Sequence, residues 1–296
     1  MIEQHFWRAC RDVLGAPKPG YAPVDDSGIP ISASDLLSSL DAAGPELARK
    51  GTSLAARITG AMKAVQLQTG RSIGCATIAA CLPLAAAAER KGLLQRNVLD
   101  VLGEASATDT ERIWHACGTE AAAGANLRRA MRNAPDHDGL ARLYAEAFSS
   151  LFNRMLPTFL RTLQRRQSNQ WAITECYLRW LALWPDGDIV RRFGPTAGTA
   201  VQGKARALLH TMERSRQIES TVPLLREWDA ELRTLDLNPR TTAALTLATA
   251  FAWQLRSMHE DDGTLKDATA EEVSTLPELM AAQTAAQQGT AQQKHR

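Results

Sequence analysis

The sequence predicts an all-α fold, and three observations support this prediction. Apolar residues recur at intervals of three, four or seven positions along most of the chain, which is the periodicity of a helix with one buried face. Alternating runs of β-branched residues, which indicate strands, are nearly absent. Alanine dominates the composition. We therefore expect a single compact multi-helix domain with a long Pro/Gly-rich loop near the N-terminus.

The composition sets limits on the class of protein. The chain has 296 residues, of which 45% are hydrophobic, and a formal net charge of +2. The apolar content excludes a chain that is disordered throughout, and the balanced charge argues against a dedicated nucleic-acid binder, which needs a basic excess. We expect the helical domain to span residues 1–280 and the Ala/Gln-rich segment 281–296 to be a disordered tail.

The N-terminal part of the chain contains a long predicted loop. Residues 15–31 contain seven glycines and prolines, too many for a helix. A loop of this length inside a compact domain is often functional. Ser34 and Asp35 then predict the N-cap of the next helix, and Thr108 and Asp109 predict a later one.

Four apolar stripes define the clearest helices. They consist of Leu54, Ile58, Met62 and Val65; Ile173, Tyr177, Trp180, Leu181 and Trp184; Val201, Leu208, Leu209 and Met212; and Leu245, Ala248, Phe251 and Leu255. In the first stripe's helix, we expect Arg57 and Lys63 to face solvent. Breaks between helices are predicted at Gly44–Pro45, Gly70, Gly103, 133–135, 185–187 and 237–239.

The chain carries no general signature of metal or nucleotide binding. Its five cysteines have no paired spacing and its six histidines are scattered singly, so we expect buried thiols in a reducing compartment. No phosphate-binding P-loop or dinucleotide glycine fingerprint is present. The N-terminus lacks an apolar secretory core, and no uncharged run approaches the ~20 residues of a membrane span. We expect a soluble, cytoplasmic protein.

Charged residues cluster at the predicted break after Trp184. Asp186 and Asp188 lie within a turn and a half of Arg191 and Arg192. Carboxylates in this arrangement can hold Mg²⁺, and guanidinium groups can bind phosphate in a bidentate manner. A charged turn that neutralises itself is an equally good interpretation of this segment.

Three other segments place polar residues at kinks. In Ala16–Gly20, two prolines stiffen the backbone around Lys18, which can meet a phosphate or serve the turn alone. In 237–242, Thr241 and Thr242 begin a predicted helix. Its free N–H groups can bind an anion, or the threonines can serve only as helix caps. Asp138 begins an apolar helix that continues through Phe148 and Phe152, and N-capping is its ordinary role.

Taken together, these segments resemble the triphosphoribosyl-dephospho-CoA synthase family, an all-α group. The resemblance rests on Ala16–Gly20, Thr69–Gly70 with Leu82–Ala87, Asp138–Phe148, Pro185–Gly194 and Trp228–Thr242. These segments follow one another in the order of the family's motifs, over most of the chain. The sequence looks closest to family members found beside one-carbon cofactor genes in methylotrophs and archaea.

The resemblance implies a reaction and a set of site residues. Members of the family transfer a 5-triphosphoribosyl group from ATP to the ribose 2′-hydroxyl of dephospho-CoA and release adenine. The implied catalytic residues are Asp138, Asp186 and Asp188, of which Asp186 and Asp188 would also hold Mg²⁺. The implied phosphate- and nucleotide-binding residues are Lys18, Arg191, Arg192, Asn238, Arg240, Thr241 and Thr242.

The sequence departs from the family at three motifs. The Asn-Thr-(Asn/His)-x-Gly signature falls on 72–76, where nearly all polar side chains are lost, and the Pro-Gly-Gly turn falls near 117–120 without its proline and second glycine. Arg240 replaces a glycine, and Ala244 replaces an aspartate. Loss of transition-state contacts at ~2–4 kcal/mol each would slow the parent reaction greatly.

Three functions therefore stay open. The first is a ribosyl-phosphate transferase with an altered donor or acceptor, in tetrahydromethanopterin or methanofuran (one-carbon carrier) biosynthesis. The second is a noncatalytic relative that serves as a binding or assembly subunit, and the third is the parent reaction. For the first, we expect a nucleotide or phosphoribosyl donor and a small cofactor precursor as partners, without nucleic acid or membrane. A homodimer is the candidate assembly.

Overall fold

The computed structural model describes residues 1–116, 127–133, 138–215 and 217–261. The α-helices are α1 Ile2–Gly15, α2 Ala33–Leu47, α3 Leu54–Thr69, α4 Cys75–Ala87, α5 Leu94–Glu104, α6 Ala107–Ala116, α7 Leu127–Arg132, α8 Gly139–Ala145, α9 Leu156–Arg166, α10 Asn169–Leu183, α11 Gly187–Phe193, α12 Pro195–Arg214, α13 Val222–Thr234 and α14 Arg240–Asp261. A π-helical turn spans Leu151–Met155 and a 3₁₀ turn spans Ile218–Thr221. The described residues contain no strand beyond one isolated bridge, Val24 to Pro30. The all-α prediction is confirmed.

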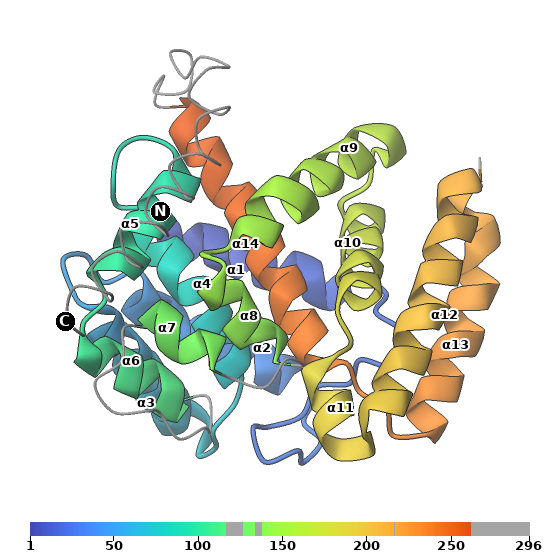
Figure 1. Cartoon of the computed structure of the whole chain (residues 1–296), viewed down its shortest axis with the longest axis horizontal. Coiled ribbons are helices and arrows are strands. Elements are labelled where there is room, and N and C mark those ends of the chain that lie inside the picture. Colours follow the sequence, from blue (N-terminus) through green and yellow to red (C-terminus); the bar gives the residue numbers. More distant parts are fainter. Residues whose placement is uncertain (117–126, 134–137, 216, 262–296) are drawn as a thin grey trace, which may run out of the picture.

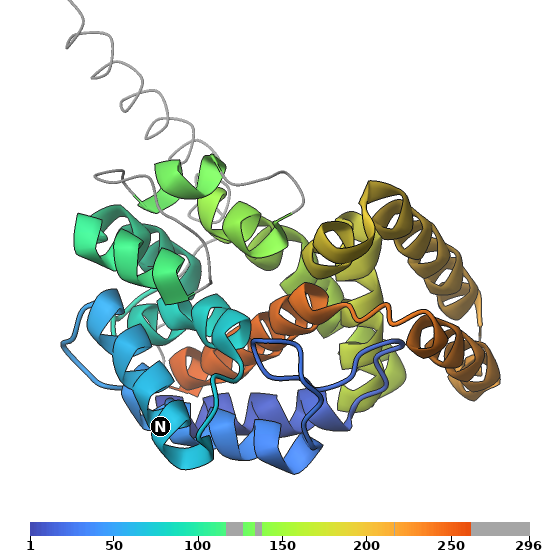
Figure 2. The ribbon, with the colours of Figure 1, turned by 90° about the horizontal axis from the view of Figure 1, so that it is seen from below.

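Helix α14 runs through the middle of the main helical body, against α1, α4 and α10 (Figure 1). Helices α12 and α13 form a hairpin at one side, and a second apolar cluster that includes Tyr177, Leu209 and Trp228 joins this hairpin to α10. The loop between α1 and α2 passes below the start of α14 toward α13 (Figure 2). The start of α14 also contacts α11, so the loop, α11 and the start of α14 lie close together.

Helix α4 is apolar on every side and lies inside the main core, as expected for a helix that faces neighbours all around. Pro83 in its middle has no N–H group, so the carbonyl of Ala79 loses its helical donor. The hydroxyl of Tyr144 in α8 donates a hydrogen bond of 2.7 Å to that carbonyl. The core therefore satisfies the buried oxygen that the proline leaves open.

The helix that begins at Asp138 does not continue through Phe148 and Phe152 as predicted. Helix α8 ends at Ala145, and Ala147 and Phe148 adopt positive φ angles of 50° and 63° before the π-helical turn begins. Both phenylalanines are nevertheless buried. The chain turns a corner here and still keeps its apolar side chains in one core.

One other sequence prediction about a helix boundary is wrong, because Gly44 and Pro45 lie inside the last turns of α2. The break predicted at Gly103 lies within one residue of the end of α5 at Glu104. A Cβ placed on Gly44 would lie 3.2 Å from Cγ of Glu3. The glycine therefore serves close packing between α1 and α2. The breaks predicted at 185–187 and 237–239 are confirmed, as is the one at Gly70, whose φ of 68° ends α3. Residues 134–137 lie outside the described part of the chain.

The predicted N-caps lie two residues too late. Ser32, not Ser34, caps α2, with a reciprocal hydrogen bond from its backbone N–H to Asp35. Ser106, rather than Thr108, accepts the N–H of Asp109 at the start of α6. Both caps are capping boxes, in which the acidic residue is the third residue of the helix and not the cap itself.

Arg57 does not face solvent as expected. Its side chain is buried, donates to the carbonyls of Leu47 and Thr52, and pairs with Glu89. The guanidinium group thus caps the end of α2 from within, which the spacing of apolar residues in α3 does not reveal.

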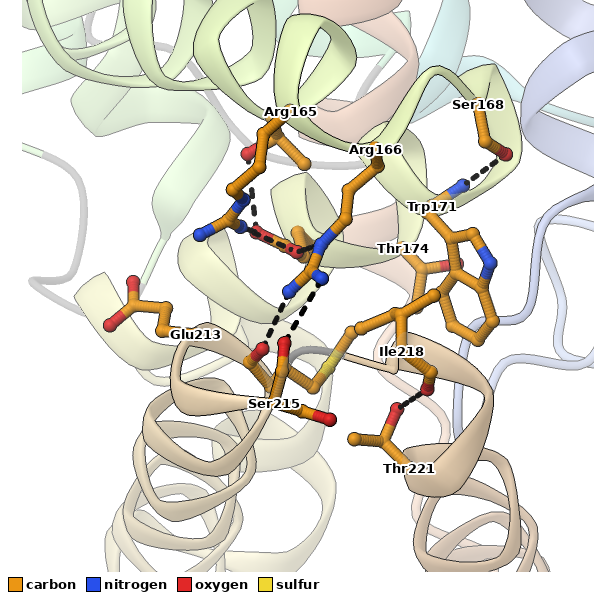
Figure 3. Close-up of polar contacts among 12 residues, drawn as sticks. Arg165, Arg166, Ser168, Trp171, Thr174, Glu213, Ser215, Ile218 and Thr221 are labelled. Atoms are coloured by element: carbon orange, nitrogen blue, oxygen red, sulfur yellow. Dashed lines mark hydrogen bonds and ion pairs between the residues drawn. The ribbon is translucent and has the colours of Figure 1, made fainter.

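A similar arginine holds the α12–α13 hairpin against α9 (Figure 3). Arg166 donates to the carbonyls of Met212 and Ser215 at the C-terminal end of α12, at 2.6 and 3.2 Å. Its Nε lies 3.3 Å from the carboxylate of Glu175, which is fully buried and also pairs with Arg165 at 2.7 Å. This network sets where the hairpin lies relative to α10.

The cysteines that the structure describes are buried, as expected, and none of them forms a disulfide. No described helix is both long enough and apolar enough to cross a bilayer. Cys117 and the segment 281–296 lie outside the described residues.

Candidate functional site

Side chains of α10 hold the first part of the loop between α1 and α2. The hydroxyl of Thr174 donates to the carbonyl of Pro17 at 2.9 Å, and that of Tyr177 donates to the carbonyl of Pro19 at 2.8 Å. Both donors lie on buried turns of α10. The proline-rich stretch is therefore an ordered part of the structure.

The middle of the loop is held by α13 and by the segment before α14. Oδ1 of Asp229 accepts the N–H of Gly20 at 2.8 Å, and Asn238 binds both the N–H and the carbonyl of Ala22, at 3.3 and 2.8 Å. Gly20 has a φ of 79°, and a Cβ there would lie 2.7 Å from Leu232. Only glycine fits this close approach. Asn238 is thus a loop-binding residue in the structure.

Lys18 points into the end of α1. Its Nζ donates to the carbonyls of Val13 and Ala16, the latter at 2.9 Å, and lies 5.3 Å from the ring centre of Tyr21. Burial lowers the pKa of its ammonium group to about 8. The cation therefore satisfies helix carbonyls, a common role at a helix C-terminus.

Asp186 joins the N-termini of α11 and α14. Oδ1 accepts the N–H groups of Asp188 and Ile189, at 2.9 and 3.3 Å. Oδ2 accepts both the N–H and the hydroxyl of Thr242, at 2.7 Å each. Burial raises the pKa of this carboxyl to about 6, against the lowering effect of Thr242. Both oxygens are fully engaged by protein donors.

Asp188 has a different environment, although it lies only two residues away. Its side chain is 4% exposed, and Oδ1 forms an ion pair with Arg191. Oδ2 lies 3.9 Å from Nη1 of Arg240 and has no hydrogen-bond partner among the described residues. A buried carboxylate oxygen without a donor costs free energy unless something supplies one. Asp188 is thus the acid in this region with a vacant acceptor.

Arg240 connects Asp188 to the loop and to the turn after α3. Its Nη2 donates to the carbonyl of Asp25 at 3.2 Å, and the Asp25 carboxylate pairs with Arg71 at 3.7 Å. The hydrogen bond from the Ser27 hydroxyl holds the pKa of Asp25 below its usual value. We call the set Arg191, Asp188, Arg240, Asp25 and Arg71 the charged track.

A cavity of about 420 Å³ lies at the Arg71 end of this track. Its lining residues are Ile31, Asp35, Ser38, Gln68, Thr69, Arg71 and Ile73. The volume lies within the roughly 300–1,000 Å³ of small-molecule sites. We call it the Arg71 cavity.

The sequence did not single out Asp25, Asp26 or Arg71. Asp26 accepts hydrogen bonds from the Ser72 hydroxyl and the Cys75 N–H, at 2.7 and 3.2 Å, so it caps α4. The available signal was a pair of adjacent carboxylates inside the long loop. Their partners come from a turn more than 40 residues away in sequence, which no local pattern predicts.

The other predicted site residues lie outside the charged track. Arg192 forms an exposed ion pair of 2.6 Å with Asp236. Asp138 caps α8 by accepting the N–H of Ala141 at 2.9 Å. Thr241 is half-buried, and its methyl group lies 3.4 Å from where a Cβ on Gly139 would be. The start of α8 therefore packs beside the start of α14.

Comparisons with known proteins identify the group to which this sequence is similar. A family model described as ATP:dephospho-CoA triphosphoribosyl transferase matches residues 2–262. The chain belongs to this family. No curated protein matches the sequence with significance.

One similar solved structure is a crystal structure from Archaeoglobus fulgidus assigned as a triphosphoribosyl-dephospho-CoA synthase. The similarity has a TM-score of 0.57 at 18% sequence identity and covers 73% of this chain and 96% of that chain. At this identity, the likeness supports a shared fold. The family resemblance inferred from the sequence motifs is confirmed.

The segment 72–76, on which the family signature falls, covers the end of the turn between α3 and α4 and the first two residues of α4. Here Ser72 donates to Asp26, and Ile73 is buried while also lining the Arg71 cavity. Ile73 is the one signature position that lines the cavity, and Asp26 supplies the polar contact to the turn. The segment 117–120 lies outside the described residues.

The carboxylates near α11 that could hold Mg²⁺ are those of Asp186 and Asp188. The described residues contain no group of three or more His, Cys, Asp or Glu side chains placed to hold a metal ion. Asp186 has no free oxygen, whereas Oδ2 of Asp188 has no donor. Mg²⁺ commonly binds through one carboxylate, several waters and substrate phosphates. The residues therefore fit an ion that enters with a polyphosphate better than one held between Asp186 and Asp188.

Proposed function

We propose that this protein is a ribosyl-phosphate transferase whose donor or acceptor differs from that of the parent reaction. The observation that supports this most is the buried, unpartnered Oδ2 of Asp188 beside Arg240. A carboxylate with a vacant acceptor can receive a hydroxyl proton from a substrate. The family membership of the chain gives the class of group that is transferred.

The proposed step is a substitution at the anomeric carbon of the donor sugar. The bond from C1′ to the leaving group breaks, and a bond from C1′ to the acceptor oxygen forms. The acceptor's hydroxyl proton passes to Asp188, and the leaving group departs with the bonding electron pair. Positive charge develops on the sugar ring, as in glycoside cleavage, and the same carboxylate stabilises it.

Arginines of the charged track would bind the donor's phosphates. Arg191 is largely exposed, and Arg240 is part-exposed between Asp188 and Asp25, so both can turn toward a ligand while they remain near Asp188. Guanidinium groups match phosphate geometry. Arg71 would extend this contact into the Arg71 cavity.

The remaining candidate residues receive positioning roles in this proposal. Asp186 and Thr242 fix α11 against α14, Asn238 and Lys18 hold the loop, and Thr241 lies in the first turn of α14. Mg²⁺ that enters with the donor would be held mainly by the donor's phosphates and by water, near Asp188, and would neutralise part of the phosphate charge. Arg192 and Asp138 would position the edges of the site, Arg192 by its ion pair with Asp236 and Asp138 by capping α8.

We also propose that the acceptor is a small cofactor precursor, in tetrahydromethanopterin or methanofuran biosynthesis. This assignment depends on the sequence resemblance to relatives beside one-carbon genes. Arg240, where the family has glycine, supports an altered ligand because it places an extra cation next to Asp188.

The noncatalytic alternative is favoured by one observation, the apolar replacement of the signature at 72–76. Calorimetry separates the two functions, because tight, Mg²⁺-dependent binding of ATP or phosphoribosyl pyrophosphate is expected only for a transferase. The absence of such binding would support the binding or assembly subunit.

The test of the proposal is product detection by mass spectrometry. ATP or phosphoribosyl pyrophosphate, with Mg²⁺, is paired with dephospho-CoA or with pterin and furan precursors of one-carbon carriers. We expect a ribosylated product from a donor and acceptor combination other than ATP with dephospho-CoA. Adenine release with ATP and dephospho-CoA alone would establish the parent reaction, and no product with any pair would contradict both transferase functions.

A further inference from the structure

A second cavity of about 360 Å³ lies between the start of the long loop, α10 and α13. It shares no lining residue with the Arg71 cavity, and Asp188 and Arg240 do not line it. We call it the Trp171 cavity. Its lining residues are Leu14, Ala16, Pro17, Lys18, Pro19, Tyr21, Pro23, Ala33, Trp171, Val222, Leu225, Arg226, Asp229 and Arg233.

The walls of the Trp171 cavity are mostly apolar and contain several rings. Two aromatic side chains, Trp171 and Tyr21, face it together with three prolines of the loop. Flat faces of this kind favour a flat apolar ligand, because ring stacking adds to the burial of apolar surface.

Hydrogen bonds and side-chain packing within the protein hold the walls of this cavity in place. The hydrogen bonds of Thr174 to Pro17 and of Asp229 to Gly20 hold the loop wall, and Trp171 packs against the core cluster of the hairpin, close to Ile218 (Figure 3). A rigid site loses little conformational entropy when a ligand binds.

Among the charged side chains that line this cavity, the guanidinium group of Arg226 is the one that can pair with a ligand. Asp229 accepts the Nε–H of Arg233 at 2.8 Å, so these two side chains neutralise each other. The ammonium group of Lys18 is held by carbonyls of α1. Arg226 is exposed on α13 and forms no ion pair or hydrogen bond within the described part of the chain.

We propose that the Trp171 cavity binds a planar aromatic molecule that carries a single negative charge, such as an aromatic carboxylate. The rings would lie against Trp171 and Tyr21, and the anionic group would pair with Arg226. One unpaired guanidinium group matches one negative charge and is poorly matched to a triphosphate, so this site is distinct from the nucleotide site proposed above.

Fluorescence titration with two dyes tests the proposal. The anionic dye is 8-anilinonaphthalene-1-sulfonate, and its neutral counterpart is N-phenyl-1-naphthylamine, which has the same rings. We expect Arg226→Gln to weaken the sulfonate about tenfold, as expected for loss of a charge-assisted contact, and to leave the neutral dye unchanged. Lys204→Gln, at an exposed position of α12, is the matched control.

A second variant tests the location of the dyes. Val222→Trp would fill the cavity and reduce the affinity for both dyes at least tenfold, whereas Leu224→Trp on the exposed side of the same helix would not. Near-ultraviolet circular dichroism checks that each variant remains folded. Equal loss of both dyes in Arg226→Gln, displacement of the sulfonate by Mg²⁺-ATP, or no saturable binding to the folded protein would overturn the proposal.

Discussion

Asp186 and Thr242 lie 56 positions apart in sequence, and Oδ2 of Asp186 accepts both the N–H and the hydroxyl of Thr242. This pair is the link that sets the start of α14 against the start of α11. Arg240, two residues before Thr242, and Asp188, two residues after Asp186, then face each other at 3.9 Å. The position of the vacant oxygen on Asp188 therefore depends on the link.

Thr242→Val removes the hydroxyl donor while it keeps the side-chain shape and the backbone N–H. We expect the free energy of unfolding to fall by about 1–3 kcal/mol, because the buried carboxylate loses one donor. Urea denaturation measures this loss. Thr241→Val is the matched control, since Thr241 is half-buried, and an equal loss in both variants would contradict the assigned role of Thr242.

The pH dependence of stability reports on Asp186. Its pKa is raised to about 6 in the folded protein, from 3.8, so the native state binds more protons than the unfolded state between these values. Stability contributed by this group is therefore present below about pH 4 and is lost as the pH rises toward 6, by up to about 3 kcal/mol.

Asp186→Asn abolishes this titration. The difference in unfolding free energy between wild type and Asp186→Asn is expected to decrease between pH 4 and pH 6 and to stay constant above pH 7. Denaturant unfolding at several pH values gives this difference. A difference that increases over the same range would show that the hydrogen bonds, rather than burial, determine the pKa of Asp186.

Asp188→Asn tests the proposed proton acceptor. With a donor and acceptor pair that gives product, we expect kcat to fall by roughly 10²–10⁴-fold, the usual contribution of general acid–base catalysis. The variant should fold normally, because the amide oxygen can still accept from Arg191. Asp236→Asn, at an exposed ion pair, is the control, and unchanged kcat in Asp188→Asn would remove Asp188 from the mechanism.

Tyr144→Phe tests the contact that compensates for Pro83 in α4. Loss of the hydroxyl leaves the buried carbonyl of Ala79 without a donor, and we expect a loss of about 1–3 kcal/mol in unfolding free energy. Pro83→Ala restores an N–H group to the helix, so the same tyrosine change should cost less in that background. A double-mutant cycle measures the coupling, and additive effects would show that the hydroxyl does not replace the missing donor.

Much of the fold could be predicted from the sequence because its signals are local. Three such signals are the stripe that ends at Trp184, the break at Pro185 and the helix start predicted at Thr241, one residue after the observed start at Arg240. Each depends on residues within a few positions of one another. The family motifs were visible for the same reason, since they are short runs such as Ala16–Gly20. The predicted N-caps were two residues too late. The Ser or Thr next to the aspartate was taken as the cap, whereas the capping serine lies three residues before that aspartate.

The candidate site could be predicted only in part. Asp188 and Arg240 were chosen from separate motifs, and the fold brings them together, whereas Arg71 and Asp25 carried no pattern of their own. Arg57 was expected in solvent because its helix face is polar in sequence, but the end of α2 lies against that face and offers carbonyl acceptors.

By itself, the sequence determined the all-helical architecture, the family and the set of charged residues at the helix ends. Only the tertiary structure decided which of these charges are used by the protein and which remain open to a ligand. The reason is that helical periodicity and capping act over a few residues, while the partner of a buried charge is chosen by how distant helices pack. Asp186 and Asp188 have the same side chain and neighbouring positions, yet packing occupies both oxygens of the first and leaves one oxygen of the second free.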